Sequence, residues 1–147
     1  MFKHILVPTD GSNLSLSAAR NAVELARISG AHVTALHVAP AYRANITEDH
    51  VPPNFMFRAD YVQHVEKEAK RHLDGVKKIA DAAGVRCESR YEMNDSPAEA
   101  IVDAAKQYAC DAIVMGSHGR KGLSRLLLGS ETHKVLVSTD LPVMVTH

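Results

Sequence analysis

The fold is decided by Asp111-Ala-Ile-Val-Met-Gly-Ser-His-Gly-Arg-Lys-Gly-Leu-Ser-Arg-Leu-Leu-Leu-Gly-Ser130, a stretch near the C-terminus. Its first residues, 112 to 115, are apolar and predict a buried strand. The motif glycines Gly116, Gly119 and Gly129 follow, and after them comes a helix that Ser130 is expected to cap. Glycine lets a backbone approach an anion closely, and a helix N-terminus offers unpaired N–H groups and a positive dipole end. A strand, a glycine loop and a helix in this order predict a phosphate-binding site.

The glycine spacing differs from those of the commoner phosphate loops. The chain has no G-x-x-x-x-G-K-[ST] and no G-x-G-x-x-G that opens a helix, so it lacks the Walker loop and the dinucleotide fingerprint. The pattern present is G-x-x-G-x(9)-G-[ST]. Basic residues surround it: Arg120, Lys121, Arg125 and Lys134 face a single acidic residue, Glu131. Because the net charge of the whole chain is zero, this local charge favours a small anionic ligand over a nucleic acid.

Length and composition are those of one globular domain, which we expect to span residues 1–147. Hydrophobic residues make up 46% and charged residues 23%, and no segment is long and apolar enough to cross a bilayer. Cys87 and Cys110 lack the spacing of a metal or redox pair, which favours reduced thiols in a cytoplasmic protein. The N-terminus has no apolar region or cleavage site of a signal peptide.

Apolar runs and helical periodicity alternate along the chain. Strands are expected at 5–7, 32–38, 85–93, 112–115 and 142–146. Helices are expected from Ser12 or Asn13 to Gly30, over 59–83, from a capping box at Ser96-Pro-Ala-Glu99 to about Tyr108, and from Ser130 to about Ser138. Residues 40–58 are irregular and favour a mobile or lid-like loop. The alternation predicts a parallel sheet with right-handed crossovers.

Two special turns follow strands of this sheet. Pro8-Thr-Asp-Gly-Ser12 comes after the first strand, and Gly116-Ser-His-Gly119 comes after the fourth. Ligands of open parallel sheets bind at the carboxyl ends of strands, where the strand order reverses. If the first and fourth strands are neighbours, one ligand can contact both turns.

Motifs in this order resemble those of the universal stress protein family, in its single-domain ATP-binding subgroup. They are Ile5-Leu-Val-Pro-Thr-Asp-Gly-Ser12, Leu36-His-Val38, Ser96-Pro-Ala-Glu99, Asp111 to Gly119, Gly129-Ser130 and Pro142-Val-Met-Val145, and they extend over essentially the whole chain. The resemblance implies an α/β fold: an open five-stranded parallel sheet of order 3-2-1-4-5 with helices on both faces. This fold is Rossmann-like, of the adenine-nucleotide α-hydrolase-like type. The resemblance also implies ATP, which Mg²⁺ or Mn²⁺ can accompany, and a homodimer often built by pairing the last strands. A regulatory role would in addition require a protein partner, which the sequence does not identify.

The family motif assigns nucleotide-binding roles to eleven residues by their matching positions. Pro8, Thr9 and Asp10 are placed beside adenine and ribose, and Val38 against adenine. Met115 and Gly116 are placed on the ribose side. The residues placed at the phosphates are His118, Gly119, Gly129 and Ser130, which Thr132 can join.

The chain departs from the family pattern at two positions. Asn94-Asp-Ser96 stands where many members have glycine before the Pro-Ala pair, which alters a turn. Glu131 stands where a small apolar residue is common. Its carboxylate can repel phosphate, help to hold a divalent ion, or point to solvent in the first helical turn, and these alternatives remain open.

Other candidate sites have simpler interpretations. His64, Glu68 and His72 lie on one helix face, which we interpret as a solvated surface opposite the apolar stripe rather than a metal site. Phe55 and Phe57 fit either a ligand cover or a dimer contact. The leucine run 126–128 is expected to pack beneath the glycine loop, and Cys110 is expected to be a structural thiol.

These patterns predict a nucleotide-dependent regulatory protein without dedicated catalysis. No paired acids, Ser-His-Asp set or metal cluster marks a catalytic centre. The alternative is a slow ATPase or autophosphorylating enzyme that uses Ser130 or Thr132. A nucleotide-independent interaction module with a vestigial site is a third possibility, which the intact motif disfavours.

Overall fold

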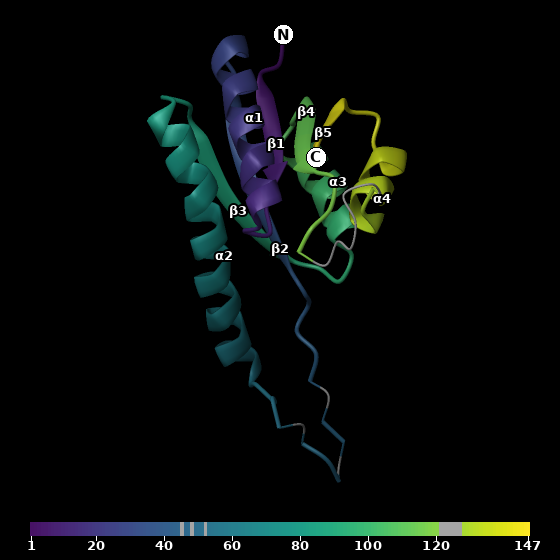
Figure 1. Cartoon of the computed structure of the whole chain (residues 1–147). Coiled ribbons are helices and arrows are strands. Elements are labelled where there is room, and N and C mark those ends of the chain that lie inside the picture. Colours follow the sequence, from purple (N-terminus) through teal and green to yellow (C-terminus); the bar gives the residue numbers. More distant parts are fainter. Residues whose placement is uncertain (45, 48, 52, 121–127) are drawn as a thin grey trace.

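The computed structural model describes residues 1–44, 46–47, 49–51, 53–120 and 128–147. Strands and helices alternate along these residues (Figure 1). The strands are β1 (His4–Pro8), β2 (His32–Ala39), β3 (Cys87–Met93), β4 (Ala112–Gly116) and β5 (Val143–Thr146). The helices are α1 (Asn13–Ser29), α2 (Arg58–Ala82), α3 (Pro97–Gln107) and α4 (Ser130–Ser138). None of the described helices has the length and hydropathy needed to cross a membrane.

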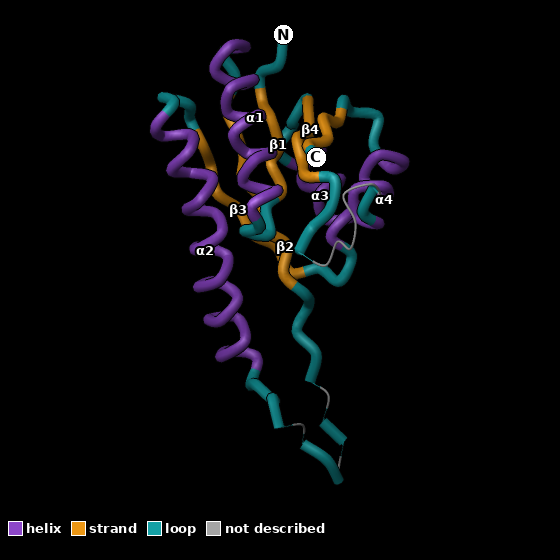
Figure 2. Tube along the Cα trace, in the orientation of Figure 1, coloured by secondary structure: helices purple, strands orange, loops and turns teal. Residues whose placement is uncertain are grey.

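The five strands form one parallel sheet of order β3-β2-β1-β4-β5, as the resemblance implied. β1 lies at its centre: Ile5 is in register with Val33 of β2 on one side and with Ala112 of β4 on the other. Figure 2 shows α1 and α2 on one side of the sheet and α3 and α4 on the other. The fold is therefore the expected Rossmann-like three-layer arrangement.

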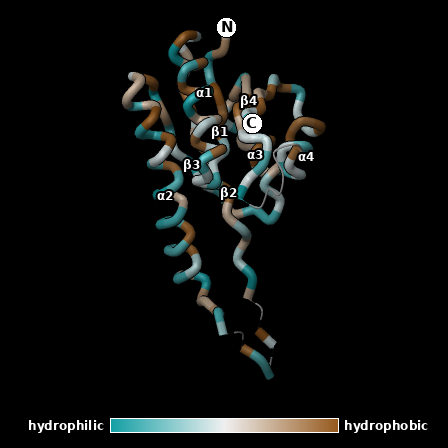
Figure 3. The backbone as a smooth tube through the Cα atoms, in the orientation of Figure 1, coloured by the Kyte–Doolittle hydropathy of each residue, from teal (hydrophilic) through white to brown (hydrophobic). Residues whose placement is uncertain are grey.

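The sheet separates two hydrophobic cores. Ile5 and Val7 pack with α1 and α2, whereas Leu6 between them packs with α3 and α4. All three are fully buried, because side chains alternate between the two covered faces of a strand. This explains why the central strand is a continuous apolar run rather than an alternating one. Along α2, by contrast, hydrophobic and hydrophilic residues alternate, as a helix with one buried face requires (Figure 3).

Helix ends follow the expected signals in part. Ser12 is the N-cap of α1 and accepts a hydrogen bond from the Ser15 amide at 3.2 Å, and Gly30 ends the helix with φ of 69°. The capping box predicted for α3 is wrong in its contacts, since the Ser96 side chain makes no capping bond. For α4, Gly129 is the N-cap and Ser130 is already the first helical residue, so the predicted capping role of Ser130 is also wrong.

The irregular segment between β2 and α2 extends away from the sheet beside the N-terminal end of α2 (Figures 1 and 2). Tyr61 of α2 donates a hydrogen bond to the Pro40 carbonyl, and Tyr42 donates one to the Met56 carbonyl. The rings of Phe55 and Phe57 pack edge to face at 5.2 Å. Phe57 remains 69% exposed, so the two roles foreseen for this aromatic pair both stay predictions.

His72 lies on the buried side of α2, so its predicted place on a solvated face is wrong. Only 8% of the residue is exposed, and its ring lies 4.9 Å from that of His37 on β2. The ring packs against Gly11 in the loop after β1: a Cβ at Gly11 would come within 1.9 Å of His72 Nδ1. Gly11 also has a φ of 77°, so both its backbone conformation and its closeness to α2 require glycine.

Gly30 offers a matched comparison for Gly11. Its φ of 69° is similar, but a Cβ there would meet nothing within 4 Å. Gly30→Ala should cost about 1–2 kcal/mol of unfolding free energy from left-handed strain alone. Gly11→Ala should cost several kcal/mol, because the new methyl group also displaces the His72 ring from its packed position.

Urea denaturation measures the backbone strain and the steric conflict with His72 separately. The variants compared are Gly11→Ala, Gly30→Ala, His72→Ala and the double variant Gly11→Ala/His72→Ala. Removing the imidazole should recover the steric part, with a coupling energy of about 1–3 kcal/mol. Equal costs at Gly11 and Gly30, or a strictly additive double variant, would contradict the proposed packing.

Candidate functional site

The two special turns lie side by side at the carboxyl ends of β1 and β4. β1 ends at Pro8 and β4 at Gly116, and the two strands are hydrogen-bonded neighbours. From β1 the sheet continues through β2 and β3 on one side and through β4 and β5 on the other. The strand order therefore reverses between β1 and β4. This is the position where ligands bind in open parallel sheets, and it is where the sequence predicted one.

Asp10 joins the two turns. One carboxylate oxygen accepts a hydrogen bond from the Ser12 amide at 3.0 Å, and the other accepts one from the Arg120 amide at 2.9 Å. Partial burial opposes ionisation of Asp10, but these hydrogen bonds outweigh it and hold the pKa of the carboxyl below its ordinary value. The ionised Asp10 carboxylate therefore connects its own turn to a residue 110 positions further along the chain.

The motif glycines sit where the two turns and α4 come closest. A Cβ at Gly119 would lie 2.8 Å from Oδ2 of Asp10. A Cβ at Gly129 would lie 3.0 Å from both the Ser117 carbonyl oxygen and the His118 Cα. The Gly129 amide donates to that carbonyl at 2.7 Å. Close contact within the protein therefore already requires glycine at both positions.

The N-terminus of α4 presents the free backbone donors. Its N-cap residue, Gly129, supplies no side-chain cap, and the first intrahelical bond runs from the His133 amide to the Gly129 carbonyl at 2.9 Å. The amides of residues 130 to 132 precede that bond and so have no partner within the helix. Ser130 is exposed at this end, while the Thr132 hydroxyl is buried and donates to the Gly116 carbonyl at 2.9 Å. The arrangement is that of an anion site at a helix N-terminus.

Residues expected at the base and ribose line the other side of the turns. Pro8 and Val38 are half-buried at the ends of β1 and β2, and Met115 is buried in β4. The Thr9 hydroxyl accepts a bond from the Gly11 amide at 3.1 Å, which fixes the turn after β1. His37 was not foreseen as part of this region. Its Nδ1 lies 2.9 Å from the Thr9 carbonyl oxygen, so the imidazole donates its Nδ1 proton there.

Comparison with known proteins identifies the family. The family model described as "Universal stress protein family" matches residues 1–147. The chain belongs to the universal stress protein family. Universal stress protein YxiE of Bacillus subtilis is 36% identical over 150 residues, which cover 99% of each chain. The solved structure of the Methanocaldococcus jannaschii protein MJ0577 has a TM-score of 0.80 at 29% identity and covers 99% of this chain and 96% of its own.

A universal stress protein from Archaeoglobus fulgidus, solved in complex with dAMP, shares the fold. Its TM-score is 0.71 at 24% identity, with 99% of this chain and 98% of that chain covered.

The remaining family-motif residue, His118, is half-buried, and its Nδ1 lies 3.1 Å from the Ser117 hydroxyl oxygen. Lys121, Arg125 and the leucines at 126 and 127 lie outside the described residues, and Leu128 is 39% exposed.

Glu131, where this chain departs from the family pattern, is engaged elsewhere in the fold. One carboxylate oxygen accepts a bond from the Ala98 amide at 3.0 Å, at the N-terminus of α3, and the other pairs with Lys134 at 3.0 Å. Glu131 therefore caps α3 in place of the Ser96 side chain. None of the three roles left open by the sequence describes this contact. At the other departure from the family pattern, the Asn94 side chain forms a turn by accepting a hydrogen bond from the Ser96 amide at 2.8 Å.

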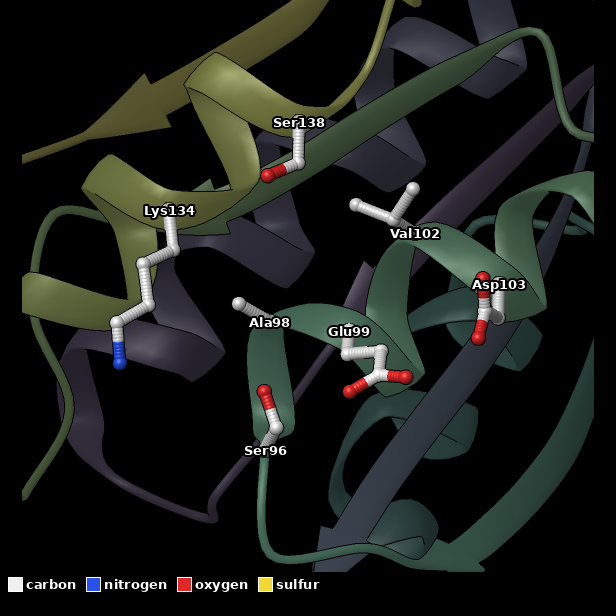
Figure 4. A pocket seen from close by; sticks show the side chains of 7 residues that line it. All are labelled: Ser96, Ala98, Glu99, Val102, Asp103, Lys134 and Ser138. Atoms are coloured by element: carbon white, nitrogen blue, oxygen red, sulfur yellow. The ribbon is translucent and has the colours of Figure 1, made fainter.

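A pocket of about 220 Å³ lies between α3 and α4 (Figure 4). Glu99 and Asp103 of α3 line one side of it, and Lys134 of α4 lines the other. Since Lys134 is already paired with Glu131, the pocket has acidic character and does not suit a phosphate. The candidate phosphate site is therefore the N-terminus of α4 and not this pocket.

The cysteines have the character of structural thiols. Burial, together with neighbouring Asp111, raises the pKa of the Cys110 thiol to about 12. Burial also raises the pKa of Cys87. Among the described residues there is no group of three His, Cys, Asp or Glu side chains arranged to hold a metal ion.

Glu131→Ala should lower the unfolding free energy by about 1 kcal/mol, the usual value of a helix cap. Lys134→Ala is the matched control, because Lys134 contacts the other carboxylate oxygen at the surface and should change stability by less than about 0.5 kcal/mol. Urea denaturation measures both. Equal effects of the two variants would contradict a cap at α3.

Proposed function

We propose that the chain is an ATP-binding regulatory protein that acts as a homodimer in the cytoplasm, where an unidentified protein partner reads its nucleotide state. The observation that supports it best is the uncapped N-terminus of α4 beside the turn that Asp10 holds. Its amides suit phosphate, and the half-buried surfaces of Pro8 and Val38 suit a flat base. The dAMP complex of a protein with this fold agrees with the choice of an adenine nucleotide.

The side chains around this site fit a nucleotide whose phosphates carry their own divalent ion. Asp10 already accepts hydrogen bonds on both oxygens, and Glu131 caps α3. Neither carboxylate is therefore a ready protein ligand for Mg²⁺ or Mn²⁺. Such ions are commonly held through substrate phosphates with one or two protein groups, and here the Ser130 hydroxyl is the exposed oxygen at the helix end.

Slow ATP hydrolysis or autophosphorylation is the second candidate, favoured by the exposed Ser130 hydroxyl. The Thr132 hydroxyl is a poorer acceptor because it is only 2% exposed and donates to the Gly116 carbonyl. With Glu131 engaged at α3, the described residues supply no evident base for an attacking water. We therefore expect turnover well below about one per second, the low end for dedicated kinases.

A charge placed at residue 130 separates ligand binding from stability. Ser130→Asp should leave the fold intact or stabilise it, because an acidic residue is favoured in the first turn of a helix. It should weaken ATP binding at least about tenfold, or 1.4 kcal/mol, by repelling the phosphates. Ser130→Asn introduces a side chain of nearly the same shape as aspartate but without its charge. This variant should bind ATP with an affinity close to that of the wild type. Calorimetry measures both affinities.

AMP and ATP locate the phosphates in the same experiment. Ser130→Asp should weaken ATP more than AMP, since only the longer phosphate chain extends to α4. Wild-type ATP affinity in Ser130→Asp would overturn this placement. Phosphate release with Mg²⁺ over an hour completes the test, and sustained turnover of several per second would favour the enzymatic alternative.

Homodimerisation through β5 is supported by the contrast between the two sheet edges. β3, at one edge, is flanked by charges in which Glu88 pairs with both Arg86 and Arg90. β5, at the other edge, carries the apolar side chain of Met144, which is 45% exposed, and Val137 of the preceding helix α4 is 69% exposed. Charges block strand addition at an edge, whereas an apolar edge invites it.

Proline substitutions at the two edges test this choice. The carbonyls of Pro142 and Thr146 bond to β4, so the amide of Val145 faces the free edge. Val145→Pro should remove that outward donor and yield a monomer in sedimentation at micromolar concentration. Ser89→Pro in β3 is the matched control, because its amide also faces outward, and it should remain dimeric. A monomeric wild type, or a dimeric Val145→Pro, would contradict the β5 interface.

A further inference from the structure

A second pocket lies on the opposite face of the sheet from α4. Its volume is about 140 Å³. The residues that line it come from α1, α2 and the turns after β1 and β4: Gly11, Leu16, Arg71, His72, Gly75 and Arg120. Figure 1 shows α1 and α2 side by side on this face, whereas α4 covers the other. Since a single water needs only roughly 10–15 Å³, the pocket can hold a group of phosphate size.

The lining is cationic. It contains two guanidinium groups and an imidazole, and no carboxylate. Arg71 is paired with Glu68 at 2.7 Å on the exposed surface of α2, while Arg120 has no ion pair with any residue that the structure describes. The Arg120 backbone is held by its bond to Asp10. Arginine is the side chain best suited to bind an oxyanion through two parallel hydrogen bonds.

His72 supplies the second, independent observation. The residue is more than nine-tenths buried, yet its ring makes no hydrogen bond within the described part of the chain. Its nearest acidic atom is Oε2 of Glu68, 3.9 Å from Nε2. Among the described residues no fully enclosed side-chain nitrogen or oxygen lacks a hydrogen-bond partner, so the unbonded ring nitrogens of His72 are accessible from the pocket that the residue lines. An anion in the pocket can therefore reach the imidazole.

The charged groups around His72 favour an anion as that partner. Burial lowers the pKa of His72, and three neighbours, His37 on β2, Arg120 after β4 and Arg71 on α2, lower it further. Glu68 on α2 is the one group that acts in the opposite direction. An anion in the pocket would offset the repulsion among these cations and favour the imidazolium, which can then donate a hydrogen bond to it.

We propose that Arg71, His72 and Arg120 form a second ligand site, which binds a phosphate-sized oxyanion between α1, α2 and the two turns. The site is separate from the N-terminus of α4, but it shares the turn of Asp10 and Gly11 and the turn of Gly119 and Arg120. An anion there holds these turns together from the other side. When the oxyanion is a free ion, linkage makes each ligand strengthen the binding of the other by the same factor. The oxyanion is either free phosphate or the terminal phosphate of the nucleotide proposed above.

The test uses the Cε1–H signal of His72 in nuclear magnetic resonance spectra, assigned by its loss in His72→Gln. Inorganic phosphate is titrated into nucleotide-free protein at several pH values. His72 should titrate at a higher pH in saturating phosphate. Because inorganic phosphate changes its own charge in this range, the affinity comparison uses sulfate, which stays a dianion and should bind about tenfold more tightly at pH 5.5 than at pH 8, as one opposite charge within about 4–6 Å predicts. Arg120→Gln should abolish both effects, and Arg27→Gln, which alters an exposed arginine in the last turn of α1, should preserve them.

Further titrations with AMP and ATP identify the source of the oxyanion. A response to phosphate alone assigns the site to the free ion, whereas a response to ATP without one to phosphate or AMP assigns it to the nucleotide. Ser130→Asp separates this inference from the proposed function, because it should weaken ATP binding and keep the phosphate response. If His72 responds to neither phosphate nor ATP, or responds equally in Arg120→Gln, the second site does not exist.

Discussion

The Asp10 carboxylate is the contact on which the arrangement of both turns depends. Its two oxygens bind the amides of Ser12 and Arg120, which lie after β1 and β4. Hydrogen bonds of this kind hold the carboxyl ionised despite its partial burial. Because β1 and β4 are adjacent, a single side chain spans the point where the strand order reverses. The groove expected there from topology is thus filled in part by a side chain, and its geometry is set before any ligand arrives.

Gly119 and Gly129 follow from this closeness. The glycine at 119 leaves room for Oδ2 of Asp10, and the one at 129 lets the start of α4 approach the Ser117 carbonyl. A glycine loop is usually explained by the approach of a phosphate to the backbone. In this chain close contacts within the protein are a sufficient reason for both residues, with the Asp10 carboxylate at Gly119 and with the backbone of Ser117 and His118 at Gly129. Substituting them therefore tests the fold as much as the ligand, whereas a charge at exposed Ser130 acts on the ligand alone.

The sequence predicts the elements of this fold well because their signals are local. Continuous apolar runs correspond to strands covered on both faces, and Ser12 and Gly30 end α1 as their chemistry requires. Strand order came from the resemblance, since periodicity alone does not order parallel strands. The site positions Asp10, Gly119 and Gly129 are brought together as expected, although the ligand roles of these residues remain predictions.

The features that the sequence did not reveal depend on tertiary contacts between distant residues. The Ser96 motif resembles a capping box, but the cap comes from Glu131, which binds the Ala98 amide from 33 residues further along the chain. His72 was predicted to lie outside the apolar stripe because histidine is a polar residue. Its spacing from Ala69 and Val76 nonetheless puts it within the roughly 100° width of a buried helix face. That spacing, together with the glycine at position 11, is the signal that predicts the buried position of His72. Gly11 has no side chain, and the His72 ring of α2 occupies the space where its Cβ would lie.

These two long-range contacts tie the nucleotide-side turns to different helices. Glu131 joins the first turn of α4 to α3 on one face of the sheet, and His72 joins the turn after β1 to α2 on the other. A displacement of either turn must therefore repack a helix, because packed interfaces shift between discrete arrangements and do not deform continuously. A ligand at the carboxyl ends of β1 and β4, as we propose, would act on both outer layers through these contacts. The helix α1 begins after Ser12, which bonds to Asp10, and its Asn21 donates a hydrogen bond to the Thr146 hydroxyl of β5 at 3.1 Å. A change at Asp10 therefore has a short physical route to the edge at which we expect the second subunit.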